Sequence, residues 1–265
     1  MAAERNGVAV VGALGRMGER VRAALAENER LTLAAALEAP GHPGLGTALE
    51  DGVRLSDDAK AAFGQADVAI DFSLPEATLA NLRVAAAAGV AYVTGTTGLE
   101  EAQRAEMASL AERTAVLHAP NFSLSVNLLV RLASEAARVL GPEVAAEIVE
   151  LHHAQKRDAP SGTALRLAEA IASSRGQALE EHLVLERAGD VGPRPPGAIG
   201  VQTLRGGNNP GEHTVLFVGD GERLELSHRA QTRDHFARGA VQAAAWLVGR
   251  EPGLYTIDQV LGFSA

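Results

Sequence analysis

A glycine-rich turn near the start of the chain restricts the possible folds more than any other feature. The apolar stretch Gly7-Val-Ala-Val-Val11 predicts a short buried strand, and Gly12-Ala-Leu-Gly-Arg-Met-Gly18 follows at once and opens a helix. Glycines allow the backbone to turn tightly and to approach a ligand, and the N–H groups at the start of the helix then face a phosphate. The spacing G-x-x-G-x-x-G is therefore a variant of the dinucleotide-binding fingerprint.

The residues after this turn support a dinucleotide site. Leu31–Leu37 predicts a second strand, and Glu38 stands at its end, about twenty residues past Gly18, where an acid accepts hydrogen bonds from ribose hydroxyls. A glycine turn alone is often purely steric, and a glutamate at a strand end is often a surface residue. The agreement of turn, helix and second strand favours the dinucleotide interpretation.

Strands and helices continue to alternate, with strands predicted at 67–72, 91–94 and 114–118 and helices at 75–88 and 100–113. The loops that follow the last two of these strands leave from carboxyl ends, where open α/β sheets bind their ligands. We interpret 95–97 and 119–122 as contacts for the nicotinamide half of the cofactor, with ordinary turns as the alternative.

The pattern changes after a long predicted helix at 125–140. A strand at 145–151 leads through a loop to a helix at 163–174, and strands at 183–186, 198–205, 214–218 and 223–230 then follow without helices between them. Consecutive strands predict a mixed or antiparallel sheet, and helices at 232–248 and 254–262 are expected to return to the first domain. We therefore predict an α/β protein with a Rossmann-type dinucleotide-binding domain at 1–123 and 233–265 and an α+β substrate-binding and oligomerisation domain with a mixed sheet at 124–232.

The loop between 150 and 164 concentrates the chemistry of the chain. His152 and Lys156 lie in it, and Lys156 is one of only two lysines among twenty-four basic side chains. Histidine exchanges protons near neutral pH, and a lysine ammonium can hold a negative charge or pass on a proton. Pro160 and Ser161 precede a predicted helix start, so N–H groups near Gly162 and Thr163 are expected to bind a carboxylate or phosphate.

Two other interpretations of this loop are weaker. Histidines at a strand end are often only packed and hydrogen-bonded, but here a lysine and a helix start accompany them. A metal site is disfavoured, because His152 and His153 are adjacent and point to opposite faces of a strand, and because no His-Glu-x-x-His motif or cysteine pair completes a ligand set. We predict no metal, and we expect His213 and His228 to be structural.

Composition excludes several classes of function. A net charge of −9 without a long basic run argues against nucleic-acid binding. The absence of cysteine excludes disulfides and thiolate catalysis. The sequence contains no apolar run of membrane-spanning length and no signal-peptide pattern, so we expect a cytoplasmic protein without a membrane partner.

The ordered set of motifs resembles the 4-hydroxy-tetrahydrodipicolinate reductase family, formerly called dihydrodipicolinate reductases, over nearly the full length. The resemblance rests on Val8 to Gly18, Gly95-Thr-Thr-Gly98, Pro120-Asn-Phe-Ser123, Glu150-Leu-His-His153, Lys156-Arg-Asp-Ala-Pro-Ser-Gly-Thr-Ala164 and Gly211-Glu-His213. It implies reduction of a cyclic dicarboxylate in lysine and diaminopimelate synthesis, with hydride delivered from NADH or NADPH to ring C4. It also implies a homotetramer assembled through the substrate-domain sheets.

The resemblance also implies roles for single residues. His152 would be the proton donor, Lys156 would assist it, and the substrate would be held by His153, Gly162 and Thr163. The cofactor-binding residues would be Gly12, Ala13, Leu14, Gly15, Arg16, Met17, Glu38, Gly95, Thr96, Thr97, Ala119, Pro120, Asn121 and Phe122.

One departure from the family pattern bears on the cofactor. Some members carry arginine directly after the strand-end acid, where it meets the 2′-phosphate of NADPH, but this chain has Ala39. We therefore favour NADH, with Arg16 as the residue that would accommodate NADPH. Two rival interpretations are a different Rossmann oxidoreductase, such as one acting on an amino-acid semialdehyde, and a cofactor-binding regulator. The first has no need of the block from Lys156 to Thr163, and the second has no need of His152 and Lys156.

Overall fold

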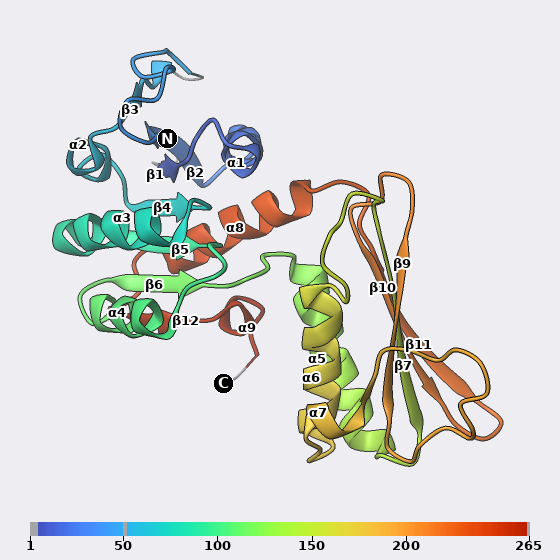
Figure 1. Ribbon diagram of the computed structural model, residues 1–265. Coiled ribbons are helices and arrows are strands. Elements are labelled where there is room, and N and C mark those ends of the chain that lie inside the picture. Colours follow the sequence, from blue (N-terminus) through green and yellow to red (C-terminus); the bar gives the residue numbers. More distant parts are fainter. Residues whose placement is uncertain (1–4, 50–51, 264–265) are drawn as a thin grey trace. The chain divides into compact units, whose positions relative to one another are not determined.

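The computed structural model describes residues 5–49 and 52–263, which fold as two compact units (Figure 1). The first unit contains the chain up to Leu124 and from Asp234 onward, and the second spans Ser125–Arg233. The divisions predicted from the sequence are 123/124 and 232/233.

The first unit is built on a seven-stranded sheet in the order β12-β6-β5-β4-β1-β2-β3, and every pairing in it is parallel. Its strands are β1 (Asn6–Val11), β2 (Leu31–Leu37), β3 (Leu55–Ser56), β4 (Val68–Asp71), β5 (Ala91–Thr94), β6 (Ala115–His118) and β12 (Gly253–Tyr255). The chain passes from β1 to one side of the sheet and later returns to the other side at β4. The carboxyl ends of β1 and β4 therefore form the switch point at which such sheets bind ligands.

Helices cover both faces of this sheet, and the alternation of β1 shows why its residues from Val8 to Val11 are all apolar. Val8 and Val10 pack in one core with α1 (Arg16–Ala26) and α8 (Asp234–Leu247), and Ala9 and Val11 pack in the other. The second core also takes side chains from α2 (Ala59–Phe63), α3 (Pro75–Ala88) and α4 (Glu101–Ala111). A parallel sheet buried on both sides requires such continuous apolar strands. The predicted Rossmann-type domain is confirmed.

The end of the chain differs from the prediction. Instead of one helix over 254–262, the chain forms the strand β12, which pairs with β6, and then the short helix α9 (Ile257–Val260). Tyr255 packs edge-on against Trp246 of α8, with ring centroids 5.5 Å apart. Pairing with β6 and this ring contact favour extended backbone at 253–255, and neither can be read from local periodicity.

The second unit has a five-stranded mixed sheet in the order β11-β10-β7-β9-β8, in agreement with the predicted mixed sheet. Its strands are β7 (Ala145–His152), β8 (Leu183–Val184), β9 (Ile199–Arg205), β10 (Glu212–Val218) and β11 (Arg223–Arg229). The helices are α5 (Leu124–Leu140), α6 (Gly162–Ser174) and the short α7 (Leu179–His182). Ile148 and Phe217 of the sheet pack against Leu167 and Ile171 of α6, so helices cover one face of this sheet.

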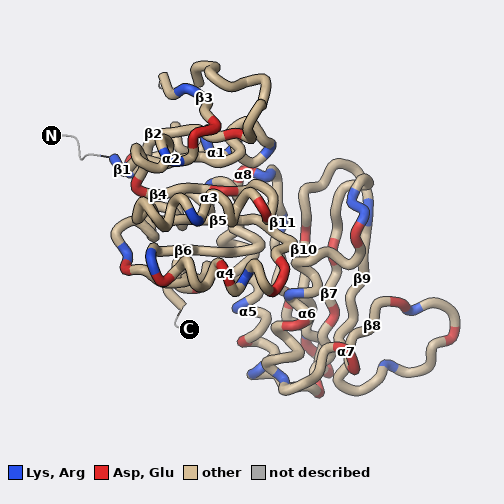
Figure 2. Tube along the Cα trace, turned by 60° about the vertical axis from the view of Figure 1, so that its left-hand side comes forward, with Lys and Arg blue, Asp and Glu red and all other residues tan. Residues whose placement is uncertain are grey.

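Buried and partly exposed positions alternate along β7 and β10, which leaves the second face of the mixed sheet open. Acidic and basic residues are interspersed along both units (Figure 2). Within residues 5–49 and 52–263, no helix has the length and apolar character needed to cross a membrane.

Candidate active site

The glycine turn between β1 and α1 has the backbone of a phosphate-binding loop. Gly12 has φ of +66°, Gly15 caps α1, and the Leu14 N–H donates to Oε1 of Glu38 at 2.8 Å. A Cβ atom on Gly18 would lie 2.1 Å from the carbonyl oxygen of Gly12, so helix and turn approach too closely for any side chain at that position. Gly12 through its positive φ, and Gly18 through this close approach, each have a structural reason to be glycine.

A cavity of about 550 Å³ opens at the switch point between β1 and β4. Its lining residues are Val11, Gly12, Gly15, Leu37, Glu38, Ala39, Pro40, Asp57, Phe72, Ser73, Leu74, Ala77, Ala80 and Asn81. Of the predicted cofactor residues, Gly12, Gly15 and Glu38 line it. Its walls are largely apolar, and Glu38 and Asp57 supply two carboxylates, while none of the described lining residues is a lysine or arginine. The glycine turn, the cavity and a strand-end carboxylate fit the adenosine half of a dinucleotide.

The two loops predicted to contact nicotinamide follow β5 and β6, which are neighbours in the sheet. A Cβ atom on Gly95 would lie 2.1 Å from the ring of Phe72, and Phe72 meets Phe122 edge-on with centroids 5.7 Å apart. The Ala119 N–H donates to the Thr94 carbonyl at 3.1 Å. The structure thus brings both loops to the same edge of the sheet as the cavity.

A buried polar network lies under the first of these loops. The Tyr92 hydroxyl donates to the Asp71 carboxyl at 2.5 Å, and the hydroxyls of Thr78 and Thr96 are 2.7 Å apart. Burial raises the pKa of Asp71, although hydrogen bonds from Ser73, Tyr92 and Thr78 oppose that shift. Burial and the neighbouring Asp71 raise the pKa of Tyr92 well above 10. The tyrosine hydroxyl therefore keeps its proton and donates a hydrogen bond to Asp71.

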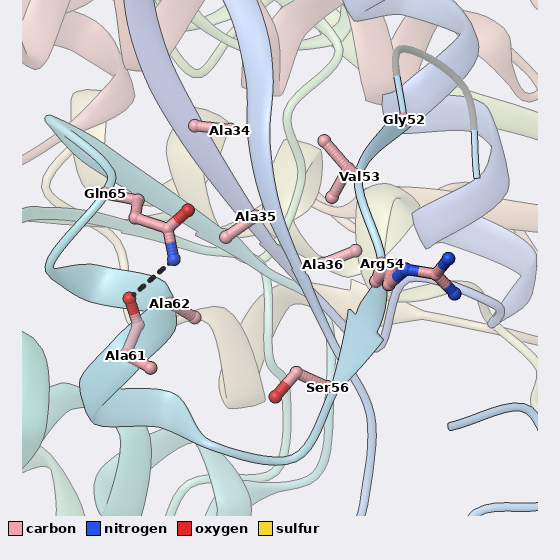
Figure 3. A pocket seen from close by; sticks show the side chains of 10 residues that line it. All are labelled: Ala34, Ala35, Ala36, Gly52, Val53, Arg54, Ser56, Ala61, Ala62 and Gln65. Carbon is pink, nitrogen blue, oxygen red and sulfur yellow. Dashed lines mark hydrogen bonds between the residues drawn. The ribbon is translucent and has the colours of Figure 1, made fainter. Parts of the chain in front are cut away.

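A second cavity of the first unit, of about 330 Å³, lies between β2 and α2 and contains none of the predicted site residues (Figure 3). Alanines 34–36 form one wall, and the side-chain amide of Gln65 is bound to the Ala61 carbonyl at 3.0 Å. Arg54 points its guanidinium toward the carbonyl of Gly46, 2.8 Å away. Small apolar side chains and polar groups that already have partners offer little to a ligand.

In the second unit, His152 is the last residue of β7, and its ring nitrogen Nδ1 is hydrogen-bonded to Oε2 of Glu150. The other carboxylate oxygen of Glu150 accepts from the Ser161 N–H at 2.9 Å, from the Thr203 hydroxyl at 3.1 Å and from Nη2 of Arg205 at 3.1 Å. Burial alone would raise the pKa of Glu150, but the hydrogen bonds from His152, Arg205 and Ser161 lower it to about 2. Glu150 is therefore a carboxylate at neutral pH.

His213, on the neighbouring strand β10, belongs to the same cluster. Its Nε2 is 3.1 Å from the Ser161 hydroxyl, and its ring meets the ring of His152 edge-on at 5.2 Å. Burial lowers the pKa of His213 to about 4, and the nearby charge of His152 adds to this effect. His213 is neutral at pH 7 and adds no positive charge next to His152.

The other predicted residues of this loop lie around the start of α6. Ser161 caps the helix by accepting from the Ala164 N–H at 3.2 Å, and a Cβ atom on Gly162 would meet no atom within 4 Å. Nζ of Lys156 is 2.8 Å from both carboxylate oxygens of Asp158. His153 points elsewhere, with its Nε2 3.3 Å from Arg233. Thr163 is the second residue of α6 and is partly exposed.

Glu150, His152 and His213 also have the residue types of a metal site, because their ligand atoms lie within 4.8 Å of one another. The two oxygens of Glu150 already accept from His152, Ser161, Thr203 and Arg205. Hydrogen bonding accounts for the arrangement, since an ion would have to displace one of these donors. The absence of a metal stays a prediction.

Sequence reasoning gave no site role to three titratable members of this cluster. Glu150 stands in the quoted motif without a role, Arg205 comes from β9, and His213 was expected to be structural. The available signal was the spacing of Glu150 and His152, because residues two apart on a strand share a face. Nothing local to Arg205 or His213 indicates which strands lie beside β7.

The first unit has a parallel sheet with a glycine turn at its switch point, and the second unit of the same chain holds a histidine–carboxylate pair. These features together define the class of nicotinamide-dinucleotide oxidoreductases built on a Rossmann fold. Family models described as dihydrodipicolinate reductase match residues 6–122 (the N-terminus of the family) and residues 125–261 (the C-terminus). The chain belongs to the dihydrodipicolinate reductase family.

Individual relatives agree with this assignment. The 4-hydroxy-tetrahydrodipicolinate reductase of Magnetococcus marinus is 48% identical over 263 residues, which cover 97% of this chain and 98% of the relative. The reductase of the same name from Desulfotalea psychrophila is 47% identical over 262 residues, covering 96% and 97% of the two chains. The solved structure of a dipicolinate-bound dihydrodipicolinate reductase from Paenisporosarcina sp. TG-14 matches with a TM-score of 0.79 and 25% identity, covering 96% of this chain and 98% of that one.

Proposed function

We propose that this chain reduces 4-hydroxy-tetrahydrodipicolinate to tetrahydrodipicolinate in the synthesis of diaminopimelate and lysine, with His152 as proton donor and Lys156 assisting. The observation that carries the proposal is the position of His152, a buried histidine at the end of β7 whose Nδ1 is bound to a carboxylate. The family of the chain and the dipicolinate bound to a solved relative support the same reaction.

The two units supply different parts of the proposed chemistry. The 4-hydroxyl of the substrate leaves as water and a conjugated cyclic imine remains. Reduced nicotinamide, when bound, supplies a hydride for ring C4 of this imine, and the electrons that move toward the ring nitrogen give an enamine. The product-forming step then needs a proton at the neighbouring ring carbon, and His152 is the group that gives it. The ammonium of Lys156 stabilises negative charge that develops on the ring, provided that it leaves Asp158, its partner at 2.8 Å.

The substrate is a dicarboxylate, and the start of α6 provides a place for one of its carboxylates. Gly162 leaves open space beside the first turn of the helix, where N–H groups attract an anion. We assign Gly162 and Thr163 to this carboxylate and His153 to the second one. The dipicolinate bound to the solved relative is a molecule of the same dicarboxylate class.

Turnover in the presence of reduced nicotinamide tests the reaction. With substrate generated in place by the preceding synthase, the wild type is expected to consume NADH. His152→Gln and Lys156→Met are each expected to lower kcat by roughly 10²- to 10⁴-fold, the usual contribution of a positioned proton donor. The affinity for NADH should not change in either variant, and Lys60→Met, a change of the other lysine, should leave turnover intact. Wild-type protein that turns over neither NADH nor NADPH would contradict the proposed function.

We favour NADH as the cofactor. Glu38 and Asp57 are two carboxylates among the residues that line the cavity beside the glycine turn, and Ala39 supplies no cation that could balance the 2′-phosphate of NADPH. Phosphate on the ribose is therefore expected not to tighten binding, whereas Ala39→Arg should shift preference toward NADPH. Calorimetric titration with both cofactors checks this, and a Kd for NADPH far below that for NADH in the wild type would contradict it.

Assembly and location complete the proposal. Four copies of the chain would associate through the open face of the mixed sheet. The family resemblance implies the same assembly. The cytoplasmic location stays a prediction.

A further inference from the structure

We propose that Glu150 is a positioning residue for His152: it fixes the proton of that histidine on Nδ1 and so assigns proton exchange with the substrate to Nε2. The inference rests on the proposed function for its catalytic consequence. Its structural content, the state of the His152 ring, can be measured without any activity.

Glu150 is isolated from water. The residue is 0% exposed, and one of its oxygens, Oε1, accepts from three donors that come from two segments of the chain. These donors are Nη2 of Arg205 on β9, the backbone N–H of Ser161 and the hydroxyl of Thr203. A carboxylate held from so many sides cannot rotate, so the oxygen that faces His152 has a fixed position.

The charge of Glu150 fixes the direction of its hydrogen bond with His152. An ionised carboxylate has no proton and can only accept a hydrogen bond. The contact between Oε2 and Nδ1 therefore requires a proton on Nδ1 of His152. When the ring is neutral, its remaining lone pair is then on Nε2, and the ring takes up a proton there. The charged ring releases that proton again from Nε2, while Nδ1 keeps its own proton.

Gly211 limits the space around Nε2 of His152. A Cβ atom on Gly211 would lie 2.9 Å from this nitrogen, so the backbone of Gly211 closes one side of the ring. Gly211 is itself fixed, because its N–H donates to Asn209 at 2.8 Å and its carbonyl accepts from Ala230 at 3.0 Å. The ring has Glu150 at one nitrogen and Gly211 beside the other, and turning it over would break the first contact.

The other charged and titratable groups near Glu150 and His152 do not change which of these two residues carries the negative charge. Arg205 comes from β9, His213 from β10, and Lys156 and Asp158 from the loop after β7. His228 of β11 pairs with His213 across the sheet and lies beyond it. Arg205 contacts Glu150 and Lys156 contacts Asp158, and Glu150 is the acidic residue in direct contact with His152.

Nitrogen-15 NMR of histidine-labelled protein tests the tautomer directly, with His152→Gln used to assign the signals. In the wild type above its titration, His152 is expected to show a protonated Nδ1 and an unprotonated Nε2. Observation of the opposite tautomer would overturn the inference, and it would do so whether or not the protein proved to be a reductase.

Kinetics of charge variants test the consequence. For a proton donor, activity declines as pH rises through the titration of His152. Glu150→Gln is expected to move this decline to lower pH by about one unit or more and to reduce kcat at least about tenfold. Glu150→Asp keeps the charge and should return the decline to within about half a unit of the wild type. KM is expected to change less than kcat in both variants.

The matched control is Glu147→Gln, on the same strand. Glu147 also binds two arginines, Arg187 at 2.7 Å and Arg194 at 3.0 Å, and its loss weakens the same sheet without touching His152. The control should show no shift of the pH profile. An equal shift in Glu147→Gln and Glu150→Gln would reduce Glu150 to a structural role. If the wild type lacks reductase activity, the proposed function fails, and the NMR result alone decides this inference.

Discussion

At the scale of single residues, the cluster around His152 holds two neighbours in opposite states. Glu150 is kept charged because Arg205, His152 and a backbone N–H all donate to it, whereas His213 is kept neutral because burial excludes a second cation. Both groups bind fewer protons than they would in the unfolded chain at acidic pH. Both therefore make the folded state sensitive to acid, in different ranges of pH.

The effect of His213 is expected at mildly acidic pH. The pKa of His213 is about 4 in the folded state and 6.5 in the unfolded state. Its contribution to the free energy of unfolding is therefore complete above pH 6.5 and is lost as pH falls toward 4. A shift of this size corresponds to roughly 3 kcal/mol, taken as an order of magnitude. Replacement by a group that does not titrate, His213→Gln, should flatten the dependence of the free energy of unfolding on pH in this window.

Urea unfolding between pH 7 and pH 4 measures this difference as a slope, so that any general loss of stability in the variant cancels. His182→Gln is a suitable control, because His182 is partly exposed and belongs to the short helix α7. Equal slopes for the wild type and His213→Gln would show that His213 takes up its proton in the folded state as readily as in the unfolded one.

At the scale of elements, the strand β4, the strand β5 and the loop after it are joined by polar groups inside the first core. Asp71 ends β4 and accepts from Tyr92 of β5, while Thr96 in the following loop contacts Thr78 at the start of α3. Backbone pairing of β4 with β5 fixes the strands, and the side-chain bonds fix the ends from which the proposed nicotinamide loop departs. Tyr92, the fully buried one of the two tyrosines, therefore lies where it can fix the start of the loop after β5.

Removal of the Tyr92 hydroxyl tests the value of this connection. Tyr92→Phe leaves the Asp71 carboxyl with fewer donors in a buried position, and the expected loss is roughly 1–3 kcal/mol in the free energy of unfolding. The chain offers Tyr255→Phe as a control, since its hydroxyl bonds the Glu251 carbonyl at an exposed position. The control should change stability by less than about 0.5 kcal/mol. Urea denaturation of the three proteins gives the comparison, and equal effects of both changes would contradict the argument.

The same scale shows what sequence can and cannot predict. The turn from Gly12 to Gly18 was predictable, because a side chain at Gly18 would collide with the Gly12 carbonyl and the spacing records that constraint. The strand β12 was not, because its extended backbone depends on pairing with β6, more than a hundred residues away in the chain. His152 and Lys156 are predicted as site residues from one loop. Arg205 and His213 were not, because strand register is set by the whole sheet rather than by local sequence.

At the scale of the whole molecule, the mixed sheet has one covered face and one open face. β7 and β9 are paired so that Leu151 lies beside Leu204, and both belong to the open face together with Val149 and Leu216. Leu204 is 46% exposed in the single chain. Apolar side chains in the middle of an open sheet favour association with a second sheet.

This surface leads to the prediction that the protein is a homotetramer and that Leu204 lies in its interface. A charge at this position, Leu204→Lys, would have to be buried without a partner on assembly, which is expected to raise the dissociation constant at least about tenfold. Light scattering coupled to size exclusion measures the mass of the wild type and the variant over a range of concentrations. Leu254→Lys is the matched control, since Leu254 is 49% exposed but lies on β12 of the first unit. A monomeric wild type, or dissociation by both substitutions alike, would show that the open face of the mixed sheet is not the interface.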